Sequence, residues 1–474
     1  MSAEYNQIGR FPKNLSYNLA KLNSSILKQK IKVETDKFSY GPNEILKVNL
    51  PIGRMIDTRS MCLYAKTTSS ATGSTGACQP HLPRGGLNSL FEQFQVTCNG
   101  KVLQSTQYYN YIWNCLADVS GYYSQEQVSK RVTELFDPSI TYTNAVGEAN
   151  PVITNNINNI TAGDTYYLCA NSFLGFFNGS VSTINTNDFG NIQISITLAP
   201  ETCMWFAKTQ GNSASSTGNT YKLEEVRLCL DTITFTNSTY YELVKTQLEG
   251  GGLNIGYYDY LAQTGNSVSK SATGITFTSQ INCSSLDQVI ATFRPETYAT
   301  IDKLYLANGI NETGAVNLTD TCLSKILADP ETNGAGYTFN NSAYFVRDGG
   351  GFDGSSWYIN SQPFTQNASA VEVINNNLQA LNYGNLDIAS GGFHSGVLTT
   401  GHFFNHYFVD ILSLENESGD NNWWVSGLSS NGGTIQIQYQ AKFKTKTNKV
   451  IPYLICRVSK ILNVKMGRLL DLME

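Results

Sequence analysis

The stretch TIQIQYQAKF, residues 434–443, alternates strictly between apolar and polar side chains from Ile435 to Phe443. The stretch NIQISITLA, residues 191–199, repeats the same period of two. A β-strand points successive side chains to opposite faces, so each stretch is predicted to be a strand with one buried and one exposed face. Many such strands separated by turn residues indicate sandwiches or barrels.

Composition supports an all-β protein. Charged residues make up 15% of the 474 residues and hydrophobic residues 41%, whereas charged residues are about 25% of an average globular chain. The chain is instead rich in Asn, Ser, Thr, Gly and Tyr, which suit strands joined by polar loops. A length of 474 residues predicts two or more domains, because one domain usually has roughly 100–200 residues.

Two short segments break the strand pattern. QYYNYIWNCLADV (107–119) and SAVEVINNNLQAL (369–381) have apolar residues at helical spacing. In the first of these segments, the apolar positions are Tyr109, Ile112, Leu116 and Val119. The dipeptide Asn99-Gly100 upstream is typical of a two-residue hairpin turn.

The same order of elements occurs twice along the chain. Each predicted helix follows a strand-rich stretch and precedes two further strands, which we expect at 191–199 and 223–235 in one case and at 404–414 and 434–443 in the other. This recurrence predicts two structurally repeated domains joined near 237–255, with two unrelated β-domains as the alternative. We also expect a strand at 343–347 and a solvent loop at TTSSATGSTGA, residues 67–77.

The ten cysteines include no C-x-x-C pair, which argues against a zinc ribbon or a thioredoxin-like site. Several lie at apolar strand positions, such as Cys98, Cys229 and Cys456, so we expect reduced, buried thiols. The sequence shows no secretory signal pattern and no apolar run of roughly 18–20 residues. We therefore expect folding in a reducing, cytosolic compartment.

No catalytic, cofactor-binding or metal-binding constellation is evident. The four histidines are His81, His394, His402 and His406. His402 and His406 lie on a predicted strand, where residues four apart are roughly 13 Å apart and cannot chelate one ion. There is no phosphate-binding G-x-x-x-x-G-K motif and no G-x-S-x-G nucleophile elbow. We predict that the protein is not an enzyme; a glycosidase remains an alternative, because paired carboxylates need only meet in space.

Positive charge is concentrated at both ends of a chain whose net charge is −5. Residues 5–33 and 442–470 contain lysines and arginines and no acidic residue. Such basic ends suit a surface that faces nucleic acid or an acidic lining. The alternative is solvated strand edges, where lysines discourage unwanted pairing. The candidate interior-facing residues are Arg10, Lys13, Lys21, Lys28, Lys442, Lys444, Lys446 and Lys449.

Four stretches resemble the double jelly-roll major capsid proteins of the adenovirus-hexon lineage, especially those of virophages and Polinton-like viruses. SLFEQFQVTCNGKVLQS and the helix after it (89–119) resemble the strand, hairpin and helix of that family's first jelly roll. LEEVRLCLDTITF and the residues after it (223–260) resemble the last strand, the linking helix and the entry into the second roll. Residues 357–381 and 406–443 resemble the corresponding strand and helix and the closing strands of the second roll.

The resemblance implies an all-β fold of two consecutive eight-stranded jelly rolls with short helices between strands. It implies an N-terminal basic arm at 1–28, a first jelly roll at 29–245 and a second at 246–474. It also implies a major capsid protein that forms pseudo-hexagonal homotrimers, which tile the icosahedral shell of a dsDNA virus. A secreted β-sandwich adhesin or lectin-like glycan-binding protein is the alternative.

Further partners follow from the same resemblance. Neighbouring capsid trimers, a penton protein with a single jelly roll and minor capsid proteins would contact the trimer. The basic termini would make non-specific contacts with the genome or an internal membrane. The protein would be made and assembled inside the host cell and would reside in the virion.

Overall fold

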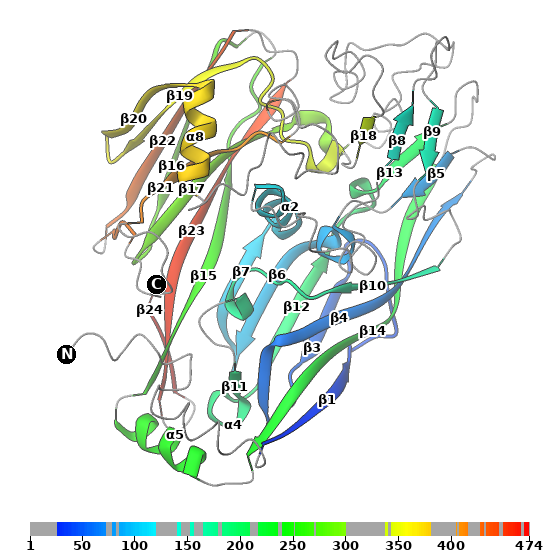
Figure 1. Ribbon diagram of the computed structural model, residues 1–474, viewed down its shortest axis with the longest axis vertical. Coiled ribbons are helices and arrows are strands. Elements are labelled where there is room, and N and C mark those ends of the chain that lie inside the picture. Colours follow the sequence, from blue (N-terminus) through cyan, green and yellow to red (C-terminus); the bar gives the residue numbers. More distant parts are fainter. Residues whose placement is uncertain are drawn as a thin grey trace.

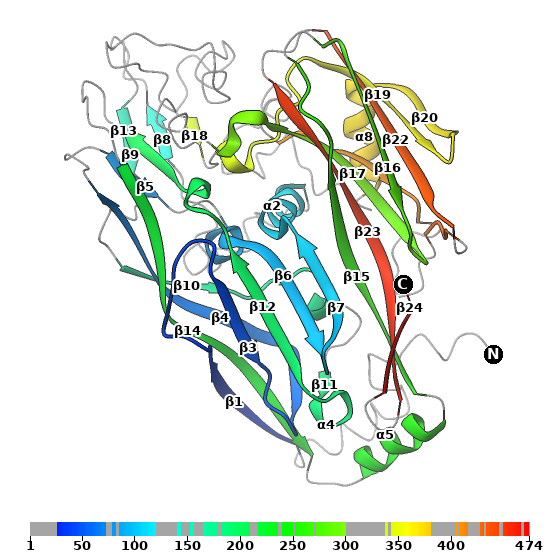
Figure 2. The ribbon, with the colours of Figure 1, turned by 180° about the vertical axis from the view of Figure 1, so that it is seen from behind.

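The structure is a computed structural model. Its main sheets form two β-sandwiches, which are joined by one helix (Figures 1 and 2). It describes residues 26–72, 78–81, 85–119, 140–143, 152–155, 165–178, 183–208, 217–235, 239–250, 252–269, 272–299, 337–339, 343–380, 404, 407–415, 427–430, 433–444, 449–465 and 469–473. Within these residues, no helix combines the length and the hydropathy that a membrane crossing requires.

The first sandwich, here the first roll, contains two sheets that enclose one core. One sheet has the order β1 (Ile26–Glu34), β14 (Thr217–Phe235), β4 (Met55–Thr72) and β10 (Thr165–Ala170). The other has the order β3 (Ile45–Asn49), β12 (Ile192–Leu198), β6 (Phe91–Cys98) and β7 (Lys101–Gln107). All of these neighbours are antiparallel.

The second roll repeats this arrangement strand for strand. One sheet has the order β15 (Leu253–Thr264), β23 (Val450–Lys465), β17 (Leu286–Pro295) and β21 (Asp410–Ser413). The other has the order β16 (Gly274–Ile281), β22 (Ile435–Phe443), β19 (Phe352–Ile359) and β20 (Gln362–Ser369). In each roll the first and last strands of the eight are neighbours. The predicted fold class, two consecutive eight-stranded jelly rolls, is confirmed.

Each roll has a helix directly after the edge strand of its second sheet. α2 (Tyr109–Val119) follows β7, and α8 (Ala370–Ala380) follows β20. The hairpin before each helix turns on two residues with positive φ, namely Asn99 (49°) and Gly100 (80°), and Asn360 (49°) and Ser361 (64°). Positive φ at both central residues matches the right-handed twist of hairpin strands. The Asn99-Gly100 hairpin and both helices were predicted from the sequence.

The remaining elements extend or connect the two rolls. α5 (Thr239–Gly250) links β14 to β15. Short strands add to the main sheets: β2 (Ser39–Tyr40) pairs with β14, β11 (Thr183–Asn185) with β4, and β24 (Leu469–Met473) with β23. Two small sheets are β5 (Cys78–His81) with β13 (Trp205–Lys208), and β18 (Tyr337–Phe339) with β8 (Ile140–Thr143) and β9 (Val152–Asn155). The short helices are η3 (Gly86–Leu90), η5 (Phe176–Asn178), α4 (Thr186–Phe189), η6 (Glu201–Cys203), η7 (Glu296–Ala299) and η10 (Ala343–Phe345).

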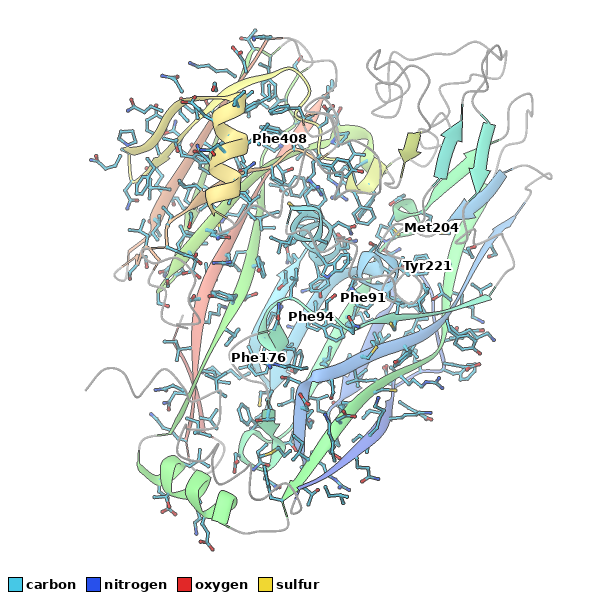
Figure 3. All side chains as sticks on the ribbon, viewed as in Figure 1. Phe91, Phe94, Phe176, Met204, Tyr221 and Phe408 are labelled. Atoms are coloured by element: carbon cyan, nitrogen blue, oxygen red, sulfur yellow. The ribbon has the colours of Figure 1, made fainter. Side chains whose placement is uncertain are left out.

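The cores are rich in aromatic side chains, and Phe91, Phe94, Phe176, Tyr221 and Phe408 are labelled in Figure 3. In the first roll, the Phe94 ring stacks on Tyr109 at 5.1 Å and on Phe173 at 5.6 Å between ring centroids. In the second, Phe293 stacks on Phe408 at 5.3 Å. Offset aromatic pairs at these separations add to the hydrophobic gain of burial.

Three sequence predictions differ from the structure. The predicted loop 67–77 is part of β4 as far as Thr72, and Thr67 and Ser69 are fully buried. These small polar residues continue the inward-facing series of Leu63 and Ala65, which hides the strand from a hydrophobicity pattern. The predicted strand 343–347 contains the short helix η10, and only Asp410–Ser413 of the predicted strand 404–414 is in β21.

The predicted boundaries fall inside secondary structure. The end of the basic arm, residue 28, lies in β1, which pairs with β14 from Ile26 onward. The step from 245 to 246 lies in α5. The sequence around residue 28 is rich in lysine, and that around residue 245 is mixed and polar, so neither shows a clear pattern. β1 is a strand because it pairs with β14, more than 200 residues away, and a local sequence pattern does not reveal such pairing.

Candidate functional site

The two rolls meet along one continuous junction (Figures 1 and 2). The first roll contributes β7 and α2, and the second contributes one face of β15, β23 and β17. Phe293 of β17 points into the core of the second roll. Thr292 and Arg294 therefore point out of that core, towards the first roll.

At one end of the junction, the long strands of the second roll pack on the first. Ile255 of β15 and Leu462 and Val464 of β23 belong to the hydrophobic core of the first roll. Tyr257 Oη donates a hydrogen bond of 2.6 Å to the carbonyl oxygen of Leu103 in β7. Because this core is shared, separating the rolls would expose apolar surface to water.

At the other end, Arg294 lies in a box of tyrosine rings. Its Nε donates to the carbonyl oxygen of Tyr344 at 2.9 Å, and Nη1 donates to Tyr453 Oη at 3.1 Å. Its Cζ lies 3.6 Å from the ring centroid of Tyr298, 4.1 Å from that of Tyr344 and 4.8 Å from that of Tyr111 in α2. Arg294 is fully buried, and within the described chain it forms no salt bridge. Aromatic faces and oxygen dipoles therefore stabilise its charge.

Three of the tyrosines around Arg294, namely Tyr111, Tyr344 and Tyr453, have a raised pKa and keep their phenol protons. Burial raises the pKa of Tyr344 and of Tyr111 above its ordinary value, and raises that of Tyr453 to about 12. Tyr344 Oη donates to Glu92 Oε2 at 2.7 Å, which ties η10 to β6. Glu92 of the first roll is thus connected through the phenol of Tyr344 to the buried guanidinium of Arg294 in the second roll.

α2 is enclosed by both rolls. Tyr109 and Trp113 belong to the core of the first roll, whereas Tyr111, Ile112 and Cys115 belong to the core of the second. All five are 0–3% exposed. The sequence predicted a helix with one apolar stripe, but α2 buries opposite faces in different cores.

We expect Arg294→Lys to destabilise the protein by about 2–4 kcal/mol. A lysine ammonium cannot stack on several rings or make both hydrogen bonds of the guanidinium. Thermal unfolding followed by calorimetry measures the loss. Arg54→Lys, at an exposed position, is the control and should stay within about 0.5 kcal/mol. Equal melting of Arg294→Lys and wild type would show that the tyrosine box is not needed for stability.

Three buried carboxylates are candidate acid–base groups, but each has structural partners. Asp410 accepts hydrogen bonds from Ser355 Oγ (2.5 Å), Tyr439 Oη (3.0 Å) and Trp357 Nε1 (3.3 Å) in the core of the second roll. Asp259 pairs with Lys460 at 3.2 Å and accepts from Thr106 Oγ1 of β7 at 3.2 Å. Asp287 accepts from the hydroxyls of Ser285 at 2.7 Å and Ser459 at 2.6 Å.

Asp410 makes stability depend on pH. Burial raises its pKa, although its three hydrogen-bond donors act in the opposite direction. The folded state therefore holds the proton more tightly than the unfolded state, and stability is lost as pH rises from about 4 through the folded-state pKa. Asp410→Asn removes this loss and keeps an acceptor oxygen. We expect its melting temperature relative to wild type to rise by several degrees between pH 4 and pH 7.

Calorimetry at both pH values measures this difference. Asp353→Asn, at an exposed carboxylate of β19 that pairs with Lys444 at 3.1 Å, is the control and should show a much smaller change. A melting difference for Asp410→Asn that is the same at pH 4 and pH 7 would contradict the assignment.

The described members of the basic set lie at two ends of the molecule. Lys28 is in β1, near the end of β14 that leads into α5. Its Nζ pairs with Asp57 at 3.2 Å and Asp231 at 3.0 Å, and these carboxylates raise its pKa. Arg10, Lys13, Lys21 and Lys446 lie outside the described residues.

Lys442, Lys444 and Lys449 lie at the opposite end of the second roll. Lys449 precedes Val450, the first residue of β23, whereas the other end of β23 pairs with Leu253, just after α5. Lys449 pairs with Glu296 at 3.6 Å, and Lys442 Nζ donates to Asn367 Oδ1 at 2.8 Å. The structure therefore does not bring Lys28 together with these three lysines.

Eight cysteines are described in full, and all are free thiols. Seven are buried, which confirms the expectation for these residues. His394, His402 and His406 lie outside the described residues. Among the residues that are described, no group of three or more His, Cys, Asp or Glu side chains is placed to hold a metal ion.

Comparison by sequence and by structure gave different results. The sequence matches no protein-family model and no curated protein. The structure is similar to the capsid of PBCV-1, with a TM-score of 0.57 and 10% identity over 95% of this chain and 97% of that one. The chain has the double jelly-roll fold of viral capsid proteins.

Two further double jelly-roll structures agree over nearly the whole chain. The Sputnik virophage structure has a TM-score of 0.55 and 12% identity, covering 94% of this chain and 88% of that chain. The Faustovirus major capsid protein has a TM-score of 0.52 and 11% identity, covering 93% and 91%. The match therefore includes both rolls.

Sequence reasoning missed the junction residues. Arg294 and Tyr344 lie in different segments, and neither was singled out. One sequence feature could have indicated the junction. QYYNYIW (107–113) contains four aromatic residues, which are too many to lie on a single buried face of a helix. In addition, Arg294 is the last but one residue of β17, a strand whose ten residues, LDQVIATFRP, are all buried. An arginine in such a run indicates a charge that must be met inside the protein.

Proposed function

We propose that this protein is the major capsid subunit of a virus, a structural protein that forms homotrimers and has no catalytic step. The observation that carries this proposal is the double jelly roll itself, which matches capsid proteins over 95% of the chain. Two rolls fixed side by side in one chain place six rolls around a threefold axis. Such a block has nearly hexagonal outline, which suits tiling of an icosahedral shell.

The rigid junction supports this proposal. A shell block must keep a fixed angle between its rolls, because an error repeated in every copy would prevent closure of the shell. A shared core, a buried cation and an enclosed helix supply that rigidity. The pentons, minor capsid proteins and neighbouring trimers are the further partners we propose, with the virion as the location.

We also propose that the α5 end of the subunit faces the shell interior. β1 begins at Ile26 and β24 is paired with the last residues of β23, so both described chain ends lie at this end. The basic residues Arg10, Lys13 and Lys21 precede Ile26 and would contact the genome or an internal membrane. This orientation places Lys442, Lys444 and Lys449 away from the interior.

Native mass measurement tests the function. We expect a stable species at three times the 52.1 kDa subunit mass and, at higher concentration, regular closed particles in electron micrographs. A secreted adhesin or lectin would instead be a monomer that binds a glycan on an array. A monomer with glycan affinity and no particles would contradict the capsid proposal.

Deletion of residues 1–25 tests the orientation. This variant keeps β1 intact, so we expect a soluble, folded trimer with the wild-type melting temperature. Shell assembly around nucleic acid should become weaker and less dependent on salt, because the basic arm is gone. Assembly and salt dependence equal to those of wild type would show that the arm does not contact the interior.

A further inference from the structure

Two cysteines of the first roll lie directly opposite each other on neighbouring strands. β4 and β14 lie side by side in both views (Figures 1 and 2), and Cys62 of β4 is the register partner of Cys229 of β14. No other two cysteines among the described strands are register partners of each other. Both are free thiols. The sheet therefore holds two thiols at a fixed separation.

The spacing of the two strands fits a disulfide bond. Directly opposite residues of an antiparallel pair have Cα atoms about 4.5 or 5.5 Å apart, depending on whether they exchange hydrogen bonds. Disulfides span Cα separations of about 4.4–6.8 Å. Leu63 and Leu228, which are also opposite each other, belong to the core of the first roll. Cys62 and Cys229 therefore both point to the outer face of the sheet, and a bond between their sulfurs needs no shift of register.

A third thiol on this face is farther away. Cys169 of β10 is the register partner of Tyr64, so it is a diagonal neighbour of Cys62. Diagonal neighbours have Cα atoms about 7–8 Å apart, which a disulfide does not span unless the backbone moves. A hydrogen bond with Cys62 and, to a smaller extent, burial and the thiols of Cys169 and Cys229 raise the pKa of Tyr64 to about 12. All three thiols thus surround one phenol, but strand register favours the pair Cys62–Cys229.

The pair lies in a short regular section of an interrupted ladder. The pairing of β14 with β4 shifts register between Glu224 and Arg227, and again between Cys229 and Asp231. Beyond the second shift, the backbone N–H of Asp231 donates to Ser60 Oγ at 2.7 Å. Register shifts disrupt the ladder locally. A covalent bond at Cys229 would hold the two strands next to the point where their backbone pairing is interrupted.

Exposure and chain separation favour a reaction that begins at Cys62 and stabilises the fold. Cys62 is half-buried, whereas Cys229 is 7% exposed, so a small oxidant in solution reaches Cys62 first. More than 160 residues separate the two cysteines in the chain. A disulfide between them would close a long loop, and a longer loop removes more conformational entropy from the unfolded chain.

We propose that Cys62 and Cys229 form a disulfide when the protein passes from a reducing to an oxidising medium, with a glutathione-type disulfide as the oxidant. The Cys62 thiolate attacks one sulfur of the oxidant, which breaks its S–S bond and releases one glutathione thiolate. The Cys229 thiolate then attacks the Cys62 sulfur of this mixed disulfide and releases the second glutathione. The two cysteine protons end on the two glutathione thiols. Two cysteine sulfurs are oxidised, and one oxidant disulfide is reduced to two thiols.

The bond would fasten β4 to β14 after the protein leaves the cell in which it is made. The cytosol keeps thiols reduced, whereas the extracellular medium allows disulfides to form and persist. This timing rests on the proposed capsid function, because a virion moves from one medium to the other. Closure of the pair by an oxidant depends only on the first roll.

Mapping of the linked cysteines tests the proposal. Folded protein is incubated with an excess of glutathione disulfide, its remaining thiols are blocked with N-ethylmaleimide, and its peptides are analysed by mass spectrometry. We expect two peptides joined through Cys62 and Cys229, which dithiothreitol separates. Two unmodified thiols, glutathione retained on Cys62, or a link from Cys62 to Cys169 would each overturn the proposal.

The melting temperature tests whether the bond stabilises the fold. Oxidised wild type should melt about 3–5 °C above the same protein treated with dithiothreitol. Cys62→Ser and Cys229→Ser should lose this difference, and Cys229→Ala serves if a buried hydroxyl impairs folding. Cys169→Ser is the matched control on the same face and should keep both the link and the gain. A linked wild type that melts no higher than the reduced protein would overturn the stabilising role.

The redox and mass measurements have separate outcomes. If wild type forms trimers and particles but the pair does not close, the disulfide proposal is wrong and the capsid proposal stands. If wild type stays a monomer without particles and the pair closes, the disulfide stands. In that case the capsid proposal falls, and with it the timing by release of a virion.

Discussion

The fixed geometry of this protein depends on how Arg294 is buried. A cation inside a protein is costly unless its charge and its donors are met. Here tyrosine rings from α2 of the first roll and from η7, η10 and β23 of the second surround the guanidinium. The charge of Arg294 is therefore fully stabilised only when elements of both rolls are in place. One terminal nitrogen, Nη2, has no hydrogen-bond partner within the described chain. The aromatic contacts must offset that cost.

This requirement couples the folding of the two rolls. The enclosed helix α2 gives one face to each core, and the long strands β15 and β23 add Ile255 and Leu462 to the core of the first roll. Neither roll has a complete core without the other. The two rolls therefore act as one rigid block, which is the property that a repeating shell element needs.

Internal repetition also shows where the two rolls differ. The same helix and the same sheet occur twice, yet only one of the two possible contacts exists within the chain. The other pair of faces is uncovered, with Val371 on one side and Tyr64 on the other. Isolated exposed apolar residues are common on protein surfaces.

The sequence by itself determined the period-two strands around Ile194 and Ile437, the Asn99-Gly100 hairpin, both helices and the order of elements that repeats. These features follow from side-chain alternation and turn chemistry, which act over a few residues. Only the tertiary structure decided that α2 is buried on two sides, that β4 continues through Ser69, and that Lys28 and Lys449 lie at opposite ends. Each of these depends on segments more than 100 residues apart, and the free energy of such contacts comes from packing that no local pattern encodes.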